Sequence, residues 1–126
     1  MSFWYPSWDF YVETHDRILE EFGGYPGIAF GGELVFSSAI QAVHELPGGL
    51  YDKAGLMLQL LRTNRIVEDA QKRTAYTVTA TFLEINGGTI SILDAEKASA
   101  FMKDILKYEL SDVIEWIKHG KIPERS

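Results

Sequence analysis

Apolar residues recur along most of the chain at intervals of three and four positions, which is the spacing of one face of an α-helix. The first stripe runs from Trp8 through His15 to Phe22, and the pair Gly23-Gly24 follows it as a helix end. Five further stripes run from Val35 to Leu46, Leu50 to Leu61, Ala75 to Ile85, Ala98 to Ile105 and Val113 to Ile117. Only residues 89–93 alternate weakly, as a short extended segment does. The pattern predicts an all-α domain of about six helices.

Turn-forming residues separate the stripes, and one stripe differs from the others. The breaks are Pro47-Gly48-Gly49, Gly87-Gly88 and Gly120. Asp94 is expected to N-cap the fifth helix, and Ser111 to begin the sixth. Leu56 and Leu60 widen the third stripe until it is apolar nearly all round. Such a helix is typical of the centre of a helical domain.

The composition is that of a single globular domain spanning residues 1–126, with 46% hydrophobic and 24% charged residues. The absence of cysteine excludes thiol catalysis and cysteine-ligated zinc, and it fits a reducing compartment. No apolar run reaches the ~18 residues of a membrane span, and the first residues lack the pattern of a signal peptide. We therefore expect a cytoplasmic protein with no membrane partner.

Two groups of side chains are expected to serve the core. Six aromatic residues crowd into the first eleven positions, and we interpret them as a cap on the helical core rather than a partner-binding patch. They are Phe3, Trp4, Tyr5, Trp8, Phe10 and Tyr11. His15 lies on the apolar face of the first helix and is interpreted as a hydrogen-bonded core histidine. His44 and His119 lie near helix ends, where surface or capping roles are expected.

Charge is unevenly distributed along the chain. Eighteen acidic and 12 basic residues leave a net charge of -6, which argues against nucleic acid as a partner. Four of the twelve basic residues nevertheless lie within residues 62–74, between the third and fourth predicted helices. They are Arg62, Arg65, Lys72 and Arg73.

This basic segment has the features of an anion site. Asp69 is predicted to N-cap the fourth helix, which leaves Lys72 and Arg73 in its first turn, where the helix dipole disfavours positive charge. Their position is favourable if an anion binds there, because first-turn amides lack intrahelical partners and two cations can close on phosphate oxygens. The alternative is a solvated basic turn paired with Glu68 or another surface acid.

The same segment resembles the signature of the Fic/Doc family, and within it the death-on-curing toxins. That signature has the form His-x-Phe-x-Asp-Gly/Ala-Asn-Lys-Arg-Thr between two helices, and this chain carries Arg65-Ile66-Val67-Glu68-Asp69-Ala70-Gln71-Lys72-Arg73-Thr74. The resemblance extends from about Val12 to Lys118. Its other parts are His15-Asp16-Arg17, Glu21-Phe22-Gly23-Gly24, Pro26-Gly27-Ile28, Phe82-Leu83-Glu84-Ile85-Asn86-Gly87 and Glu115-Trp116-Ile117.

The resemblance implies a single Fic/Doc-type domain with the motif loop between its third and fourth helices. It implies binding of ATP with Mg²⁺, transfer of phosphate or AMP to a protein hydroxyl, a translation factor as target, and an antitoxin partner. Asp69 is then expected to hold the metal or the anion loop, and Lys72 and Arg73 to neutralise phosphate charge. Ala70 and Thr74 complete the expected nucleotide-binding set, while Gln71 stands where the family has Asn.

The signature is degenerate at three positions, and the first decides the chemistry. Arg65 stands at the position of the catalytic histidine, and a guanidinium stays protonated at physiological pH. It cannot act as the general base, whose contribution is commonly ~10² to 10⁴ in rate. Val67 replaces the motif Phe, and Gln71 adds one methylene at the Asn position.

Three functions remain open on the sequence alone. The first is a Doc-like toxin whose ATP-dependent transfer is impaired, or uses another base such as Glu68. The second is a catalytically silent Fic-fold protein that binds a nucleotide or an antitoxin-like partner, with Arg65 as a third cation beside Lys72 and Arg73. The third is a structural helical module with a basic turn.

Overall fold

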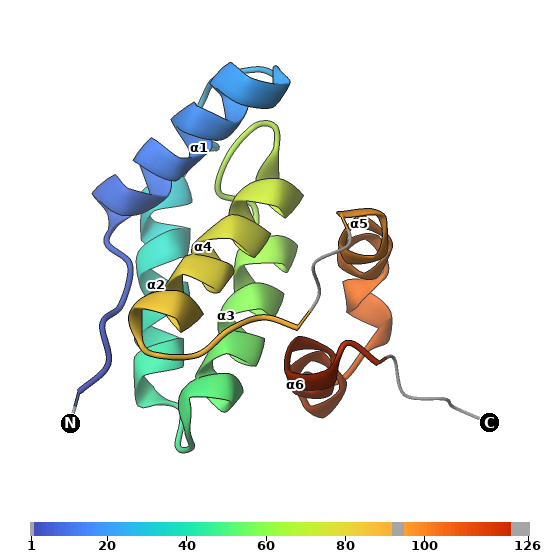
Figure 1. The fold of residues 1–126 in the computed structure, drawn as a ribbon. Helices are drawn as coiled ribbons and strands as arrows, with labels where there is room; N and C mark the ends of the chain where they lie inside the picture. Colours follow the sequence, from blue (N-terminus) through green and yellow to red (C-terminus); the bar gives the residue numbers. More distant parts are fainter. Residues whose placement is uncertain (1, 92–94, 122–126) are drawn as a thin grey trace.

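The computed structural model describes residues 2–91 and 95–121, and within them the chain folds into six α-helices and one 3₁₀ turn (Figure 1). The α-helices are α1 Trp8–Phe22, α2 Gly32–Glu45, α3 Leu50–Thr63, α4 Gln71–Ile85, α5 Ala95–Lys103 and α6 Leu110–His119. The expected all-α class is confirmed. Among the described residues, no helix is both long and apolar enough to cross a membrane.

Two sequence expectations need correction or fall outside this range. The fifth helix was predicted to continue to Ile105, but α5 ends at Lys103, and Ile105–Lys107 form the separate 3₁₀ turn η1. This turn lets Ile105 remain in the core while the chain changes direction toward α6. The predicted N-cap Asp94 lies outside the described residues.

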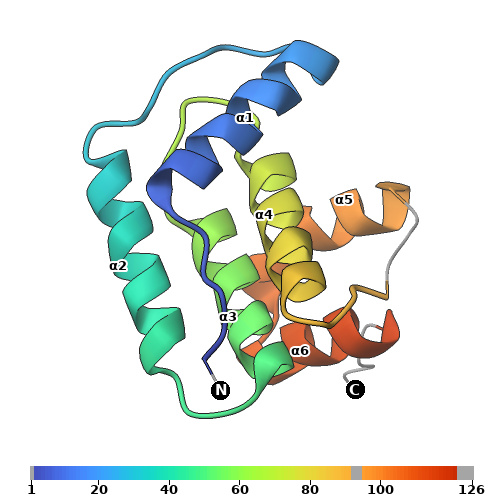
Figure 2. The same ribbon diagram turned by 60° about the vertical axis from the view of Figure 1, so that its left-hand side comes forward.

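Helix α3 is the centre of the domain, as its apolar pattern predicted. It packs against α2 and α4 on one side and α6 on the other (Figures 1 and 2). Gly55 allows the close approach of α6, because a Cβ there would lie 2.5 Å from Cγ1 of Ile114. Four apolar side chains of α3 are completely buried, namely Ala54, Met57, Leu58 and Leu61.

The aromatic N-terminus packs onto the core, which confirms the interpretation of these residues as a cap. Tyr11 is fully buried, and its ring stacks on Trp8 and contacts Phe36 of α2. Asn86, the C-cap of α4, exchanges two hydrogen bonds with the backbone of Trp4. The segment before α1 is therefore tied to the far end of α4.

A buried lysine closes the C-terminus of α2, and nothing in the sequence pattern pointed to it. Lys53 is only 6% exposed. Its ammonium donates hydrogen bonds to the backbone carbonyls of Val43 (2.9 Å), His44 (3.0 Å) and Leu46 (2.8 Å). The last carbonyls of a helix have no intrahelical partner and carry partial negative charge, so one cation here satisfies three acceptors.

Replacing Lys53 with methionine tests this role. Lys53→Met keeps most of the volume but removes three charge-assisted bonds, so the free energy of unfolding should fall by about 2–3 kcal/mol in urea denaturation. The control is Lys107→Met, since Lys107 is exposed and makes only a surface ion pair with Asp104 at 3.4 Å. That change should stay within ~0.5 kcal/mol. Equal effects of the two substitutions would contradict the capping role.

Candidate functional site

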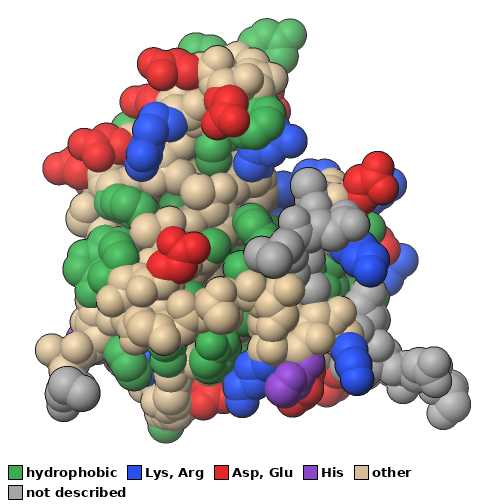
Figure 3. All heavy atoms as spheres, viewed as in Figure 1, with side chains coloured by type: hydrophobic (Ala, Val, Ile, Leu, Met, Phe, Trp, Pro, Cys, Tyr) green, Lys and Arg blue, Asp and Glu red, His purple; other side chains and the backbone are tan. Residues whose placement is uncertain are grey.

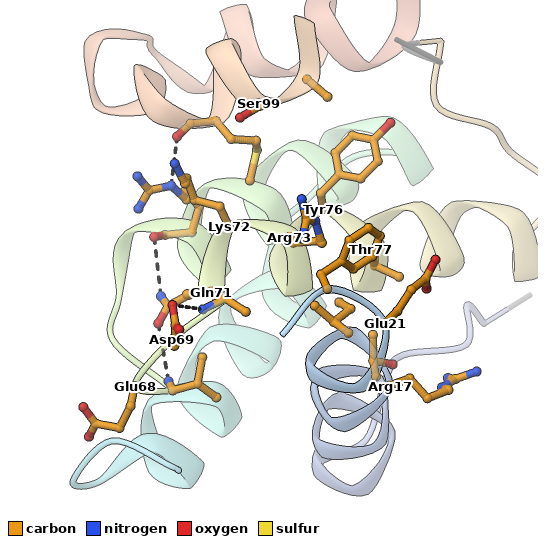
Figure 4. Close-up of a pocket in the computed structure, with 18 of the residues that line it drawn as sticks. Arg17, Glu21, Glu68, Asp69, Gln71, Lys72, Arg73, Tyr76, Thr77 and Ser99 are labelled. Atoms are coloured by element: carbon orange, nitrogen blue, oxygen red, sulfur yellow. Dashed lines mark hydrogen bonds between the residues drawn. The ribbon is translucent and has the colours of Figure 1, made fainter. Parts of the chain in front are cut away.

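A cleft of about 1060 Å³ opens beside the start of α4. Figure 4 shows Arg17 and Glu21 projecting from α1 on one side, Lys72 and Arg73 from α4, and Ser99 from α5 opposite. The end of α3 and the loop of residues 64–70 complete the wall. The basic segment singled out in the sequence therefore borders a concave site.

The cleft carries an excess of positive charge in an acidic protein. Five cationic and three acidic side chains line it. They are Arg17, Arg62, Arg65, Lys72 and Arg73 against Glu21, Glu68 and Asp69. Elsewhere on the surface acidic side chains predominate, and in Figure 3 they gather over α1 at the upper left. This separation of charge favours an anionic ligand in the cleft.

The first turn of α4 leaves its amides available. Its N-cap is Ala70, which has a left-handed backbone conformation (φ 62°, ψ 25°). The prediction that Asp69 is the N-cap is therefore wrong, because the chain makes its sharp turn one residue later. In the described part of the chain no group accepts from the amides of Gln71, Lys72 or Arg73, and the helical ladder begins with Thr74 N–H donating to the Ala70 carbonyl at 3.1 Å.

Asp69 instead fastens the motif loop to the segment before α2. One carboxylate oxygen accepts the amide of Tyr25 at 3.0 Å, and the other accepts that of Ala70 at 2.8 Å. Both N–H groups stabilise the charged form of the carboxylate, and the Tyr25 group has the larger effect. They hold the pKa of the Asp69 carboxyl below its usual value. The backbone carbonyl of Asp69 accepts a hydrogen bond from His15 Nε2 at 2.9 Å.

The reading of His15 as a hydrogen-bonded core residue is confirmed, and it has a positional consequence. The side chain is 1% exposed and reaches from α1 to the motif loop. On its other side the loop pairs with residues 27–29, where Ala29 N–H donates to Ile66 O and Glu68 N–H to Gly27 O. An isolated antiparallel bridge joins Ile28 and Val67. The motif loop is thus held from two directions.

Gln71 and Thr74 use their polar groups within the loop and helix. The Gln71 amide oxygen accepts from Ile66 N–H at 2.9 Å, and its nitrogen donates to the carbonyls of Leu61 and Asn64. Thr74 is fully buried and donates to the Ala70 carbonyl at 2.8 Å. Both side chains shape the site through the backbone, and a direct part in catalysis or nucleotide binding stays a prediction for them.

The cations of the motif differ in how they are held. Arg65 is two-thirds exposed and forms an ion pair with Glu68 at 2.8 Å, so the surface-pairing alternative holds for this residue. The Arg73 guanidinium lies 3.8 Å from the centroid of the Phe22 ring. Within the described residues neither Lys72 nor Arg73 makes an ion pair. Arg62 is anchored by a hydrogen bond from Nε to the Met102 carbonyl at 2.8 Å.

Sequence reasoning missed the part of the cleft that α1 and α5 supply. Arg17 and Glu21 were noted only within segments of the family resemblance and Ser99 not at all, because all three lie far from the motif in the chain. One signal was available: Arg17 is the only Lys or Arg in α1, a helix that carries five acidic residues.

Ala70 provides a test of the turn that opens the site. It is the only non-glycine residue with a positive φ in the described chain, a conformation that costs a Cβ-bearing residue roughly 1 kcal/mol. Ala70→Gly should therefore raise the free energy of unfolding by about 0.5–1 kcal/mol. Ala80→Gly, within the same helix, should lower it by about 1 kcal/mol. Chemical denaturation of both variants checks the contrast, and a loss of stability in Ala70→Gly would refute it.

Comparison with known proteins identifies a relative of this chain. No family model matches the chain. A search of curated proteins finds similarity to Toxin Doc of Mycolicibacterium smegmatis, with 34% identity over 92 residues. The match spans 62% of this chain and 70% of that protein. On this similarity, with an all-helical fold that holds the motif loop between α3 and α4, the chain belongs to the Doc toxin family.

Proposed function

We propose that this chain acts as the Doc-like toxin of a toxin–antitoxin pair, and that its cleft binds the phosphates of ATP. Transfer of phosphate or AMP to a protein hydroxyl is then impaired by Arg65. The observation that carries the proposal is the cationic cleft at the open first turn of α4. The family resemblance supplies the remaining parts, namely an antitoxin-like partner, a translation factor as target and a cytoplasmic location.

Phosphate binding follows from the chemistry of this helix start. Three backbone N–H groups without internal partners point along the helix axis, and the helix dipole adds a partial positive charge. Two of these three residues, Lys72 and Arg73, also carry cationic side chains, and charge-assisted bonds from such groups to phosphate are about twice as strong as neutral ones. The cleft is also large enough for a nucleotide, since small-molecule sites commonly measure roughly 300–1,000 Å³.

Proton abstraction is the step for which the site is poorly equipped. Phosphoryl transfer depends mainly on positioning and electrostatic stabilisation, and the cations can supply both. The attacking hydroxyl must still lose its proton, and the Arg65 guanidinium has no lone pair to accept it. Glu68, the substitute base suggested by the sequence, is engaged by Arg65 at 2.8 Å. Slow transfer is the consequence.

A second candidate is a catalytically silent member of the family that retains the anion site. The Arg65–Glu68 ion pair favours it, because Arg65 stands at the position of the motif base and engages the carboxylate that was expected to substitute for it. In this case the chain binds a nucleotide or an antitoxin-like partner and transfers nothing. The two candidates share the ligand and differ in turnover.

Thermal unfolding tests the shared ligand. ATP at roughly tenfold excess over its Kd should raise the Tm by about 4–7 °C, because it binds only the folded chain. The double variant Lys72→Ala/Arg73→Ala should lose this shift. The control is Lys103→Ala/Lys107→Ala, which removes two cations that do not line the cleft. This variant should keep the shift. If ATP does not raise the Tm of the parent protein, nucleotide binding is contradicted and the structural helical module remains.

Restoring the motif histidine distinguishes slow transfer from silence. If Arg65 alone limits the reaction, Arg65→His should raise transfer of label from radioactive ATP to translation factors by roughly 10²–10⁴-fold. Arg65→Gln is the matched control, because it removes the guanidinium without adding a base. Incorporation by neither variant would favour the silent binder, while equal gains in both would point to release of Glu68.

A further inference from the structure

The family resemblance assigns a divalent metal to Asp69, and the structure allows this assignment to be examined atom by atom. Mg²⁺ at phosphate sites is usually bound through one or two carboxylates together with the phosphates. Three carboxylates line this cleft, on Glu21, Glu68 and Asp69. A metal held by the protein therefore requires at least one of them to be available toward the phosphates.

Each carboxylate oxygen of Asp69 already accepts one backbone N–H group. One accepts Tyr25 N–H at 3.0 Å and the other Ala70 N–H at 2.8 Å. The oxygen bonded to Tyr25 is also packed against the segment after α1, because a Cβ on Gly24 would lie only 2.9 Å from it. A metal bound here would have to share these oxygens with the two N–H groups, and a rotation that freed an oxygen would break a bond that holds the loop.

The other two carboxylates do not replace it. Glu68 is neutralised by its ion pair with Arg65. Glu21 projects from α1 on the opposite side of the cleft from the motif loop (Figure 4). In the part of the chain that the structure describes, no three acidic, histidine or cysteine side chains gather closely enough to hold a metal.

The surrounding charge opposes a dication as well. Five cationic side chains line the same cleft against three acidic ones, and this excess of positive charge repels Mg²⁺ while it attracts phosphate. Chelation of Mg²⁺ by ATP removes negative charge from the phosphates that Lys72 and Arg73 would contact. The cations of the protein and the metal thus compete for the same oxygens.

We propose that this cleft binds ATP as the metal-free polyanion in preference to its magnesium complex. The protein's own cations and the open amides of α4 take the place that the metal has in the family pattern. The inference rests on the proposed nucleotide function, and it alters the expected role of Asp69 from a metal ligand to a positioning residue for the loop of residues 23–31.

Calorimetric titration of the full chain with ATP tests this preference. Titrations in EDTA and in excess MgCl₂, at matched ionic strength, should give a Kd that is roughly three- to tenfold weaker with magnesium. The same pair of titrations on Glu68→Gln, which frees Arg65, should keep the preference for metal-free ATP. Mn²⁺ alone should show no saturable binding by electron paramagnetic resonance.

The outcomes separate this inference from the function on which it rests. Binding that is equal or tighter in MgCl₂ overturns the metal-free preference and leaves nucleotide binding intact. If Asp69→Asn removes a gain caused by magnesium, the family role of Asp69 is restored. Absence of ATP binding under both conditions overturns the inference and the proposed nucleotide function together.

Discussion

The hydrogen bonds that converge on Asp69 hold three distant segments in one arrangement. Its carboxylate fastens the backbone at Tyr25, and its carbonyl receives the buried His15 of α1. Directly after it, Ala70 turns through a left-handed conformation into α4. Because α4 can begin only where this turn ends, the position of its open amides and of the cations Lys72 and Arg73 in the same turn depends on these contacts. The cleft exists as a result of them.

The wall behind this loop is built on α3, whose burial makes it a rigid reference for the site. Gln71 ties the start of α4 to the last carbonyls of α3, and Arg62 ties the end of α3 to the Met102 carbonyl of α5. Such anchors limit how far the walls of the cleft can move. Gln71 and Thr74 use their polar atoms on backbone groups of the loop and helix, so they shape the site through the backbone.

A cluster of cations around one cleft is unfavourable for the free protein and favourable for an anion complex. The structure reduces the cost by pairing Arg65 with Glu68 and placing Arg73 over the Phe22 ring. Both contacts are at the surface, where such interactions contribute little, so a polyanion can replace them. Arginine at position 65 fits this arrangement, because it adds another positive charge to the rim.

Local pattern was sufficient for the helices and for the basic segment. Apolar spacing and glycine pairs lie within a few residues of each other, so the ends of α1 and α4 and the burial of α3 could be read directly. The core role of His15 also followed from its place on the apolar face. The family resemblance then identified the loop before α4 as the part to examine.

The remaining features depend on contacts between residues far apart in the chain. Asp69 was predicted to cap α4, yet its carboxylate accepts the amide of Tyr25, 44 positions away. Tyr25 lies outside any helix, so its amide needs an acceptor from another part of the chain. Lys53 is buried only because the end of α2 offers it three carbonyls. The sequence by itself determined which segments are helical and where positive charge gathers, since both are local properties. The tertiary structure decided that Glu21, Glu68 and Asp69 line one cleft and that Asp69 is bound by the distant Tyr25 amide, because both depend on long-range packing.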